Sequence, residues 1–396
     1  MDTQWRLERE VESLVARRTG RECVFMPSGR IALYCAFRAL LSPGDRVLMS
    51  PVNDDVIFFV VLAAGLRPVA APLSAADGNI DLQAVPSQTW SQIRAVLTTN
   101  LYGLPDRVVE LRQRCNAHGV VLIEDVAHAI ETEVDRAALG TFGTAAAFSL
   151  SKHVDAYRGG VLAIADLNLR GEIERIREGI QTKPSLTRRF VDNVKPAVKG
   201  VLEAAGFMKK IRQARESAAA RYAERPTGSH RMDLRPEALR EAIAGGPALS
   251  AFEPWVRVDR HDFLVRPGVM DLRRMLDRLH GLDADREHRI RGVERLCREL
   301  GCVAPGARSG APLPLFRLPL LVAGRDAAVA ALAARGVLVR YMYDPPLDDY
   351  AGAEFMAPSA APAPGRWWAR HALPIDPIKA ELALPVLVQL QAAPSQ

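Results

Sequence analysis

A lysine and an aspartate each follow a short apolar run, and together they could support amine chemistry. Lys152 comes shortly after the run Ala145–Leu150, and Asp125 comes after the run Val120–Ile123. A lysine amine can attach to an aldehyde, and a carboxylate can keep a pyridine nitrogen protonated. Pyridoxal phosphate (PLP) needs both groups, so these two residues predict a PLP site.

A second stretch could hold the phosphate of such a cofactor. Ser28, Gly29 and Arg30 open a helix predicted at 31–41. The N–H groups at a helix start bind phosphate, glycine permits close approach, and arginine adds charge. A serine that caps the helix explains the same residues without a ligand, and that alternative stays open.

Other polar residues nearby allow both functional and structural interpretations. His128 follows Asp125 closely enough to reach the same ligand, although a lone histidine is more often structural. Asp125 could instead cap a helix predicted at 126–133. Ser149 and Lys152 have the S-x-x-K spacing that also occurs in beta-lactamases. No S-D-N or K-T-G element follows them, which argues against that enzyme class.

The elements that must position these residues alternate between strands and helices. Helices are predicted at 56–65, 106–118 and 126–133. The apolar, strand-like runs are Arg46–Met49, Pro68–Pro72, Ile93–Thr98, Val120–Ile123, Ala145–Leu150 and Val161–Ala165. This alternation predicts an α/β fold with a mostly parallel sheet covered on both faces. Ligands of such sheets lie beyond the carboxyl ends of the strands, where Asn100, Asp125 and Ser149 fall.

In the second half of the chain, strands and helices no longer alternate regularly. The segment 171–255 is basic and helix-rich. A long helix is predicted at 269–300, followed by two strand candidates, Leu315–Val322 and Val337–Met342, with a helix at 325–335 between them. We therefore expect a large domain over 1–255, which contains the helical insertion, and a small α+β domain over 256–396.

The composition is that of an ordinary soluble protein, with 48% hydrophobic and 25% charged residues among 396. The first residues lack the apolar core of a signal peptide, and no apolar run approaches the roughly 20 residues that span a bilayer. Five cysteines without a CxxC pair argue against a disulfide framework or a zinc site. We expect a cytoplasmic protein with no metal site.

The net charge of +6 is concentrated in one segment. Between Lys183 and Arg215 nine basic residues stand against two acidic ones, a net +7, so the rest of the chain is nearly neutral. This pattern indicates one basic segment and argues against nucleic-acid binding. A helix here could pack as a lid, contact an anionic membrane surface peripherally, or bind a protein partner.

Several short motifs follow one another in a fixed order. They are P-S-G-R-I-A-L from Pro27, P-G-D-R-V from Pro43, N-L-Y-G from Asn100, E-D-V-A-H-A from Glu124 and Y-M-Y-D-P-P-L from Tyr341. The set resembles the DegT/DnrJ/EryC1/StrS family of PLP-dependent sugar aminotransferases, over most of the chain. The resemblance implies fold type I, with a seven-stranded sheet between helices, a smaller C-terminal α+β domain, and a homodimer with shared active sites.

The resemblance also implies a role for each matched residue. Lys152 would hold PLP covalently and later move protons, Asp125 would pair with the pyridinium, and His128 would lie near the phenolic oxygen. The phosphate would be held by Ser28, Gly29, Arg30 and Ser149.

The chain departs from the family pattern at several positions. The lysine lies three residues after Ser149, where the family usually has five, and Arg30 replaces a threonine. Asp55, next to Asp54, stands where the family has an aromatic residue that stacks on the cofactor ring. The family's G-Y-N-x-R-M loop aligns with 262–267, which retains Arg266, or alternatively with 228–232. Candidate substrate contacts are Asp54, Asp55, Tyr102, His153 and Arg266.

These observations predict an aminotransferase with an amino-acid donor and a keto-sugar, keto-cyclitol or similar ketone as acceptor. The two adjacent acids and the insertion leave a second PLP reaction open, such as elimination, decarboxylation, racemisation or carbon–carbon bond formation. A non-catalytic member of the fold is a third alternative, which an intact Lys152 and Asp125 argue against.

Overall fold

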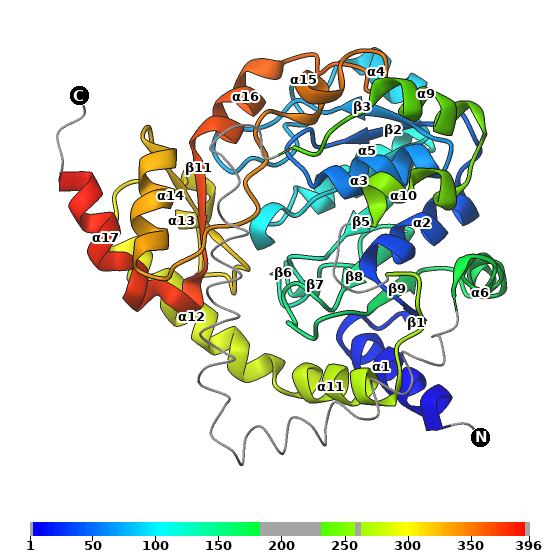
Figure 1. Cartoon of the computed structure of the whole chain (residues 1–396), viewed down its shortest axis with the longest axis horizontal. Coiled ribbons are helices and arrows are strands. Elements are labelled where there is room, and N and C mark those ends of the chain that lie inside the picture. Colours follow the sequence, from blue (N-terminus) through cyan, green and yellow to red (C-terminus); the bar gives the residue numbers. More distant parts are fainter. Residues whose placement is uncertain (1–2, 183–230, 258–262, 393–396) are drawn as a thin grey trace.

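The computed structural model describes residues 3–182, 231–257 and 263–392 (Figure 1). Its centre is a seven-stranded sheet with the order β1-β9-β8-β5-β4-β2-β3. The strands are β1 (Glu22–Met26), β2 (Arg46–Met49), β3 (Arg67–Ala70), β4 (Ala95–Thr98), β5 (Val121–Asp125), β8 (Ala145–Ser149) and β9 (Gly160–Ile164). Neighbours from β8 to β3 run parallel, whereas β9 is antiparallel to both β1 and β8. The predicted α/β, mostly parallel sheet is confirmed.

Both faces of this sheet are covered by helices, so its strands are apolar on both sides. Successive residues of β5 enter different cores: Leu122 joins one apolar cluster and Ile123 the other. The covering helices are α1 (Thr3–Thr19), α2 (Gly29–Leu40), α3 (Asp55–Ala63), α4 (Ser87–Gln92), α5 (Val108–His118) and α6 (Leu169–Ile180).

The register of β5 and β8 brings the two chemistry-bearing segments together. These strands are parallel neighbours, with Asp125 opposite Ala147. Their carboxyl ends therefore open at the same sheet edge, where the chain turns into the segment after Asp125 and the segment after Ser149. The fold places Asp125 and Lys152 at one edge, as the strand pattern predicts.

A smaller unit lies at the far end of two helices, α11 (Val269–His280) and α12 (Leu282–Glu299) (Figure 1). Its antiparallel pair is β10 (Leu318–Leu321) with β11 (Ala372–Ile375). Around this pair lie α13 (Pro305–Arg308), α14 (Arg325–Ala334) and α17 (Ala380–Ala392), and a third apolar cluster joins Leu296, Leu318, Leu332 and Leu373. In the sequence, α15 (Leu347–Ala351) and α16 (Pro362–His371) lie between α14 and α17. Their buried apolar residues belong to the apolar clusters on the two faces of the large sheet.

Some predicted elements are wrong in detail. The helix predicted at 269–300 is two helices, because the chain breaks at Gly281. Residues 337–342 form no strand; β10 pairs with β11 instead. No helix occupies 126–133: turns follow Asp125, and Glu133 begins the short strand β6 (Glu133–Val134). β1 was not predicted as a strand, although its apolar residues pair with β9.

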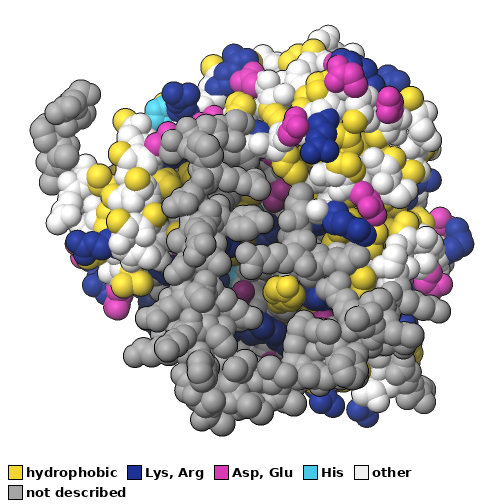
Figure 2. All heavy atoms as spheres, viewed as in Figure 1, with side chains coloured by type: hydrophobic (Ala, Val, Ile, Leu, Met, Phe, Trp, Pro, Cys, Tyr) yellow, Lys and Arg dark blue, Asp and Glu magenta, His cyan; other side chains and the backbone are white. Residues whose placement is uncertain are grey.

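Much of the basic insertion lies outside the described residues, including the whole segment 183–215 with its predicted lid or membrane role. The described parts on either side are α6, α9 (Pro236–Ala244) and α10 (Glu253–Val256), and α9 and α10 pack against α3. The proposed domain boundary at 255 stays a prediction. Among the described helices none is long and apolar enough to cross a bilayer. In Figure 2 basic and acidic side chains lie interspersed over the described surface of one face.

Candidate active site

Lys152 lies in the turn that follows β8, at the carboxyl edge of the sheet. Its ammonium nitrogen is 3.6 Å from the Asp54 Oδ2 atom. The same nitrogen is 4.4 Å from the centre of the Tyr341 ring, close enough for a cation–π contact. The side chain keeps a quarter of its surface exposed, at 25%. The lysine therefore lies between an acid of the large sheet's edge and an aromatic ring of the C-terminal part of the chain.

Asp125 ends β5 and is buried, with 7% of its surface exposed. Its Oδ1 atom accepts a hydrogen bond from the Ala127 N–H at 3.0 Å, and its backbone carbonyl accepts one from the Asn100 amide at 2.9 Å. Burial raises the pKa of Asp125 to about 7, against the opposing influence of the Ala127 N–H and Lys152. The carboxyl can therefore gain or lose a proton near neutral pH.

Asp54 is the N-cap of α3 and contributes the second acid of the site. Its Oδ1 atom accepts a hydrogen bond from the Val56 N–H at 3.1 Å, which leaves Oδ2 facing Lys152. Burial opposes its ionisation, but Lys152 and the Val56 N–H outweigh burial and lower the pKa of Asp54. Its negative charge also helps to raise the pKa of Asp125. Lys152, Asp54 and Asp125 thus form one electrostatically coupled group.

His128 lies three residues beyond Asp125 in a group of aromatic rings. It stacks on Phe316 at 4.6 Å between ring centres and meets Tyr341 edge-on at 5.4 Å. Burial and nearby cations hold the pKa of His128 well below its usual range, so the ring is neutral. Tyr102, a predicted substrate contact, is buried at 1% exposure and donates its hydroxyl to the Tyr341 carbonyl at 2.7 Å. Tyr102 is therefore a buried residue that holds the Tyr341 backbone in place.

The Ser28–Gly29 segment meets the ends of β8 and β9 at very short range. A Cβ atom on Gly29 would lie 2.8 Å from the Ser149 Cβ, and one on Gly160 would lie 2.5 Å from the Ser28 carbonyl carbon. Only glycine allows this approach, which brings the first N–H groups of α2 beside the Ser149 hydroxyl. Ser28 also caps α2 through the Ile31 N–H at 3.4 Å. The cap interpretation is thus realised, and the same helix start offers the N–H groups and the serine hydroxyl that a phosphate needs.

Arg30 makes protein contacts of its own. Its guanidinium donates to the Val256 carbonyl and lies over the Phe263 ring, 4.9 Å from its centre. Both partners belong to the segments that follow the insertion. Its predicted contact with phosphate stays a prediction.

Three predicted substrate contacts pair with other side chains of the protein. His153 has no exposed side-chain surface and contacts the Glu131 carboxylate. Asp55 is buried in an ion pair with Arg231. Arg266 forms a double hydrogen bond with Glu8 of α1, at 2.7 Å for each pair of atoms. Each of the three therefore has a partner other than Lys152, and Arg266 keeps 37% of its side chain exposed. Their contact with substrate stays a prediction.

Arg231 was not predicted as a site residue. It holds the Asp54–Asp55 loop by donating to Asp55 and, at 2.7 Å, to the Asn53 carbonyl. It also donates to the Pro345 carbonyl at 2.7 Å. The signal was the alternative placement of the R-M pair at 231–232, which places Arg231 beside this loop.

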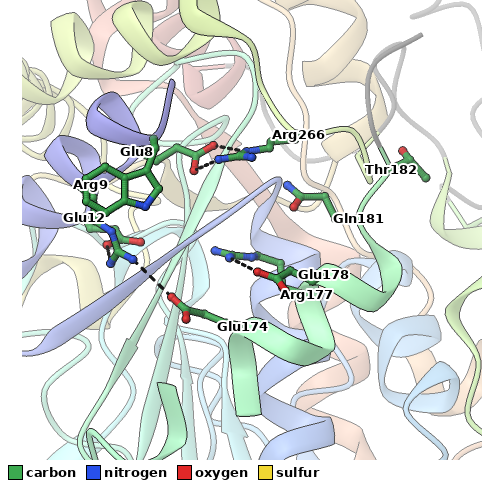
Figure 3. Close-up of a pocket in the computed structure, with 10 residues that line it drawn as sticks. Glu8, Arg9, Glu12, Glu174, Arg177, Glu178, Gln181, Thr182 and Arg266 are labelled. Atoms are coloured by element: carbon green, nitrogen blue, oxygen red, sulfur yellow. Dashed lines mark hydrogen bonds and ion pairs between the residues drawn. The ribbon is translucent and has the colours of Figure 1, made fainter. Parts of the chain in front are cut away.

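Arg266 instead lines a separate cavity of about 470 Å³ between α1 and α6 (Figure 3). Its charged lining residues pair with one another or with neighbours, as in the contacts Arg266–Glu8 and Arg9–Glu174 drawn there. Neither Lys152 nor Asp125 lines this cavity. Within the described part of the chain, no cluster of three or more potential metal ligands is present.

The donor set of the site suits PLP. A partly exposed amine, a buried carboxyl that exchanges its proton near neutral pH, a neutral imidazole and a glycine cradle at a helix start converge at one sheet edge. They match the aldehyde, ring nitrogen, phenolic oxygen and phosphate of that cofactor. The residues present fit the group.

Comparisons with known proteins lead to the same chemistry. The model of the DegT/DnrJ/EryC1/StrS aminotransferase family matches residues 3–215. The GDP-perosamine synthase of Vibrio cholerae is 30% identical over 138 residues, which cover 34% of this chain and 38% of that protein. The L-glutamine:2-deoxy-scyllo-inosose aminotransferase of Streptomyces kanamyceticus is 30% identical over 158 residues, 39% of this chain and 37% of that protein. Each match spans less than half of the relative.

Solved structures share the fold over nearly the whole chain. The E. coli GDP-4-keto-6-deoxy-D-mannose-3-dehydratase with bound hydrated PLP matches with a TM-score of 0.66 and 16% identity. The superposition covers 96% of this chain and 91% of that one. At this identity the likeness establishes the architecture alone.

Proposed function

The chain belongs to the DegT/DnrJ/EryC1/StrS aminotransferase family, and from this membership we propose that it is a PLP-dependent aminotransferase. It moves an amino group from an amino-acid donor to a keto-sugar, keto-cyclitol or similar biosynthetic ketone. The observation that carries the proposal is the convergence of the Lys152 amine and the buried Asp125 carboxyl at one sheet edge.

Four groups of this chain would hold the cofactor. Lys152 would bind its aldehyde and Asp125 would pair with its ring nitrogen. His128 would lie near its phenolic oxygen, and the start of α2 together with Ser149 would bind its phosphate. When bound, PLP supplies an electron sink that stabilises negative charge on the carbon attached to the transferred amine.

The chain's own residues then manage protons. Burial raises the pKa of Asp125 to about 7. Its carboxyl group can therefore share a proton with a basic ring nitrogen. Lys152 Nζ would take the proton from the donor carbon that bears the amine and later return one to the acceptor carbon, and its side chain is partly exposed at the sheet edge. The neutral His128 adds no positive charge of its own.

The acceptor class is inferred from the relatives. The perosamine synthase and the scyllo-inosose aminotransferase are named for a sugar and a cyclitol. We assign this chain the broader class of cyclic, hydroxyl-rich ketones.

The test is a half-reaction without acceptor. Purified protein loaded with PLP is incubated with glutamate or glutamine, and both the visible cofactor absorbance and the keto-acid product are followed. Transamination is supported if the visible absorbance band of the cofactor disappears and one keto acid forms for each cofactor. A panel of amino donors that leaves the band unchanged would contradict it.

A second candidate is elimination from a sugar on the same scaffold. A relative with the same fold is a 3-dehydratase, and Asp54 places an extra acid 3.6 Å from the lysine amine. With its pKa lowered by Lys152, the Asp54 carboxylate could accept a proton in such an elimination. Release of water from a keto-sugar without net amine transfer would favour this reaction over transamination.

We also propose that the protein works in the cytoplasm as a homodimer whose partner completes the site. The family resemblance is the support for both statements. The possible peripheral membrane contact through 183–215 stays open, since those residues lie outside the described ones.

A further inference from the structure

A buried glutamate–histidine pair lies directly beneath the proposed site. His153 Nε2 is 2.8 Å from Glu131 Oε2, and neither side chain has any exposed surface. His153 Nδ1 lies 3.1 Å from the His128 carbonyl oxygen. The aminotransferase chemistry proposed above uses neither of these side chains directly.

The hydrogen bonds fix how many protons the pair holds. A carbonyl oxygen only accepts, so His153 Nδ1 must donate to His128. The short Nε2–Oε2 contact then needs one more hydrogen between the two atoms. The pair is either an imidazolium with a carboxylate or a neutral imidazole with a carboxylic acid. Its net charge is zero in both cases.

The pair joins the two turns that carry the cofactor-binding side chains. His153 is the residue after Lys152, in the turn that follows β8. His128 and Glu131 belong to the turns that follow Asp125 at the end of β5. The turn that contains Lys152 has backbone hydrogen bonds of its own, such as the one from the Ala156 N–H to the Leu150 carbonyl at 2.8 Å. These bonds do not connect it to the turn that follows Asp125. The imidazole links it to the acid's turn.

Stability alone does not explain this pair. Two buried ionisable groups cost desolvation, and an apolar pair of similar volume is often as stable or more so. Glu131 Oε1 is buried and has no hydrogen-bond partner among the described residues. This cost is consistent with a positional role for the pair.

We propose that Glu131 and His153 are positioning residues that hold the Lys152 turn in register with Asp125, so that one cofactor can bind to both. The inference rests on the proposed PLP function. It predicts that the hydrogen-bonded geometry matters, whereas the charges of the pair do not.

Three variants separate position from stability. Glu131→Gln keeps a donor to neutral His153 and the zero net charge. Glu131→Leu removes the partner. The double variant His153→Phe/Glu131→Leu replaces the whole pair by apolar side chains. For each, the PLP Kd is measured from the visible absorbance of the titrated protein, and the unfolding temperature is measured without cofactor.

We expect Glu131→Gln to bind PLP within about threefold of wild type, because its hydrogen bond survives. The double variant should unfold near the wild-type temperature but bind PLP roughly tenfold or more weakly. If the double variant does not fold, Glu131→Leu is compared with Glu131→Gln by the same Kd, and the same weakening is expected.

Wild-type affinity in the folded double variant, or in Glu131→Leu when that variant replaces it, would overturn the inference. Equal loss of affinity in Glu131→Gln and Glu131→Leu would also overturn it, because the charge would then matter more than the hydrogen bond. Wild-type protein that binds no PLP would sink the proposed function itself, which is a distinguishable result.

Discussion

Asp125 shows how burial prepares a side chain for a ligand. A carboxyl at the end of a covered strand loses its water, and only the Ala127 N–H and the more distant Lys152 compensate for its charge. Burial therefore raises its pKa to about 7, far above that of an exposed aspartate. A protonated pyridine nitrogen would provide the missing partner.

This pKa predicts the pH dependence of the cofactor-free protein. The folded pKa lies above the unfolded one, so the contribution of Asp125 is complete below about pH 4 and is lost as pH rises toward 7. The loss amounts to at most about 1.4 kcal/mol per pH unit. The free energy of unfolding is measured by urea denaturation of wild type and Asp125→Asn between pH 4 and 8. The difference between the two proteins should fall as the pH rises. A difference independent of pH would contradict it.

Asp54 combines two roles in one carboxylate, and substitution can separate them. Asp54→Asn retains a good helix cap but removes the charge beside Lys152, whereas Asp54→Ala removes both. We expect Asp54→Ala to lower the free energy of unfolding by about 1 kcal/mol and Asp54→Asn by much less. Both should shift the pH profile of turnover. Identical profiles in wild type and both variants would remove Asp54 from the reaction.

At the scale of elements, the phosphate cradle depends on how closely α2 approaches β8 and β9. The Ser28 N-cap and Gly160 of β9 are in backbone contact, and Gly29 meets Ser149. The start of α2 therefore lies next to Ser149 without an intervening side chain, and N–H groups at a helix start favour a bound phosphate.

Gly160→Ala should disrupt this contact. Its Cβ would fall 2.5 Å from the Ser28 carbonyl carbon, and a backbone atom cannot rotate aside. We expect a loss of about 1–3 kcal/mol in unfolding free energy, together with weaker PLP binding. Gly171→Ala on α6, where a Cβ meets nothing within 4 Å, is the matched control and should be neutral or stabilising. Equal behaviour of the two variants would contradict the close approach.

The elements predicted correctly from the sequence are those whose own residue pattern is sufficient to identify them. β5 and β8 are covered on both faces, so a continuous apolar run marks them. The segment 126–133 was mistaken for a helix, because Asp125 accepts from the Ala127 N–H as a helix cap does, yet no helix follows. The strand predicted at 337–342 failed because its pairing partner was unknown; β10 pairs with β11 from a distant segment.

At the scale of the whole molecule, the site is assembled from segments far apart in the chain. Tyr341 and Phe316 close over Lys152 and His128, and Arg231 ties the Asp54 loop to Pro345. The motifs predicted Lys152, Asp125 and His128, because each follows a strand that sets its position. Arg231 had only a weak signal, the alternative R-M placement at 231–232, and the Glu131–His153 contact had none, since both depend on tertiary contacts.

The proposed homodimer is testable at this scale. Sedimentation equilibrium of the PLP-loaded protein should give twice the chain mass of 43.3 kDa. Dilution should lower turnover per chain if the partner completes each site. A single-chain mass at concentrations where the enzyme is fully active would contradict the shared site.

The central claim is that Lys152 holds PLP, and the visible absorbance spectrum tests it most directly. Purified wild type, Lys152→Ala and the control Lys379→Ala, a lysine outside the site on η3 (Pro377–Lys379), are titrated with PLP. Free PLP is removed before each spectrum. We predict a retained visible band in wild type and Lys379→Ala and none in Lys152→Ala. An equal band in Lys152→Ala, or no band in wild type, would contradict the account.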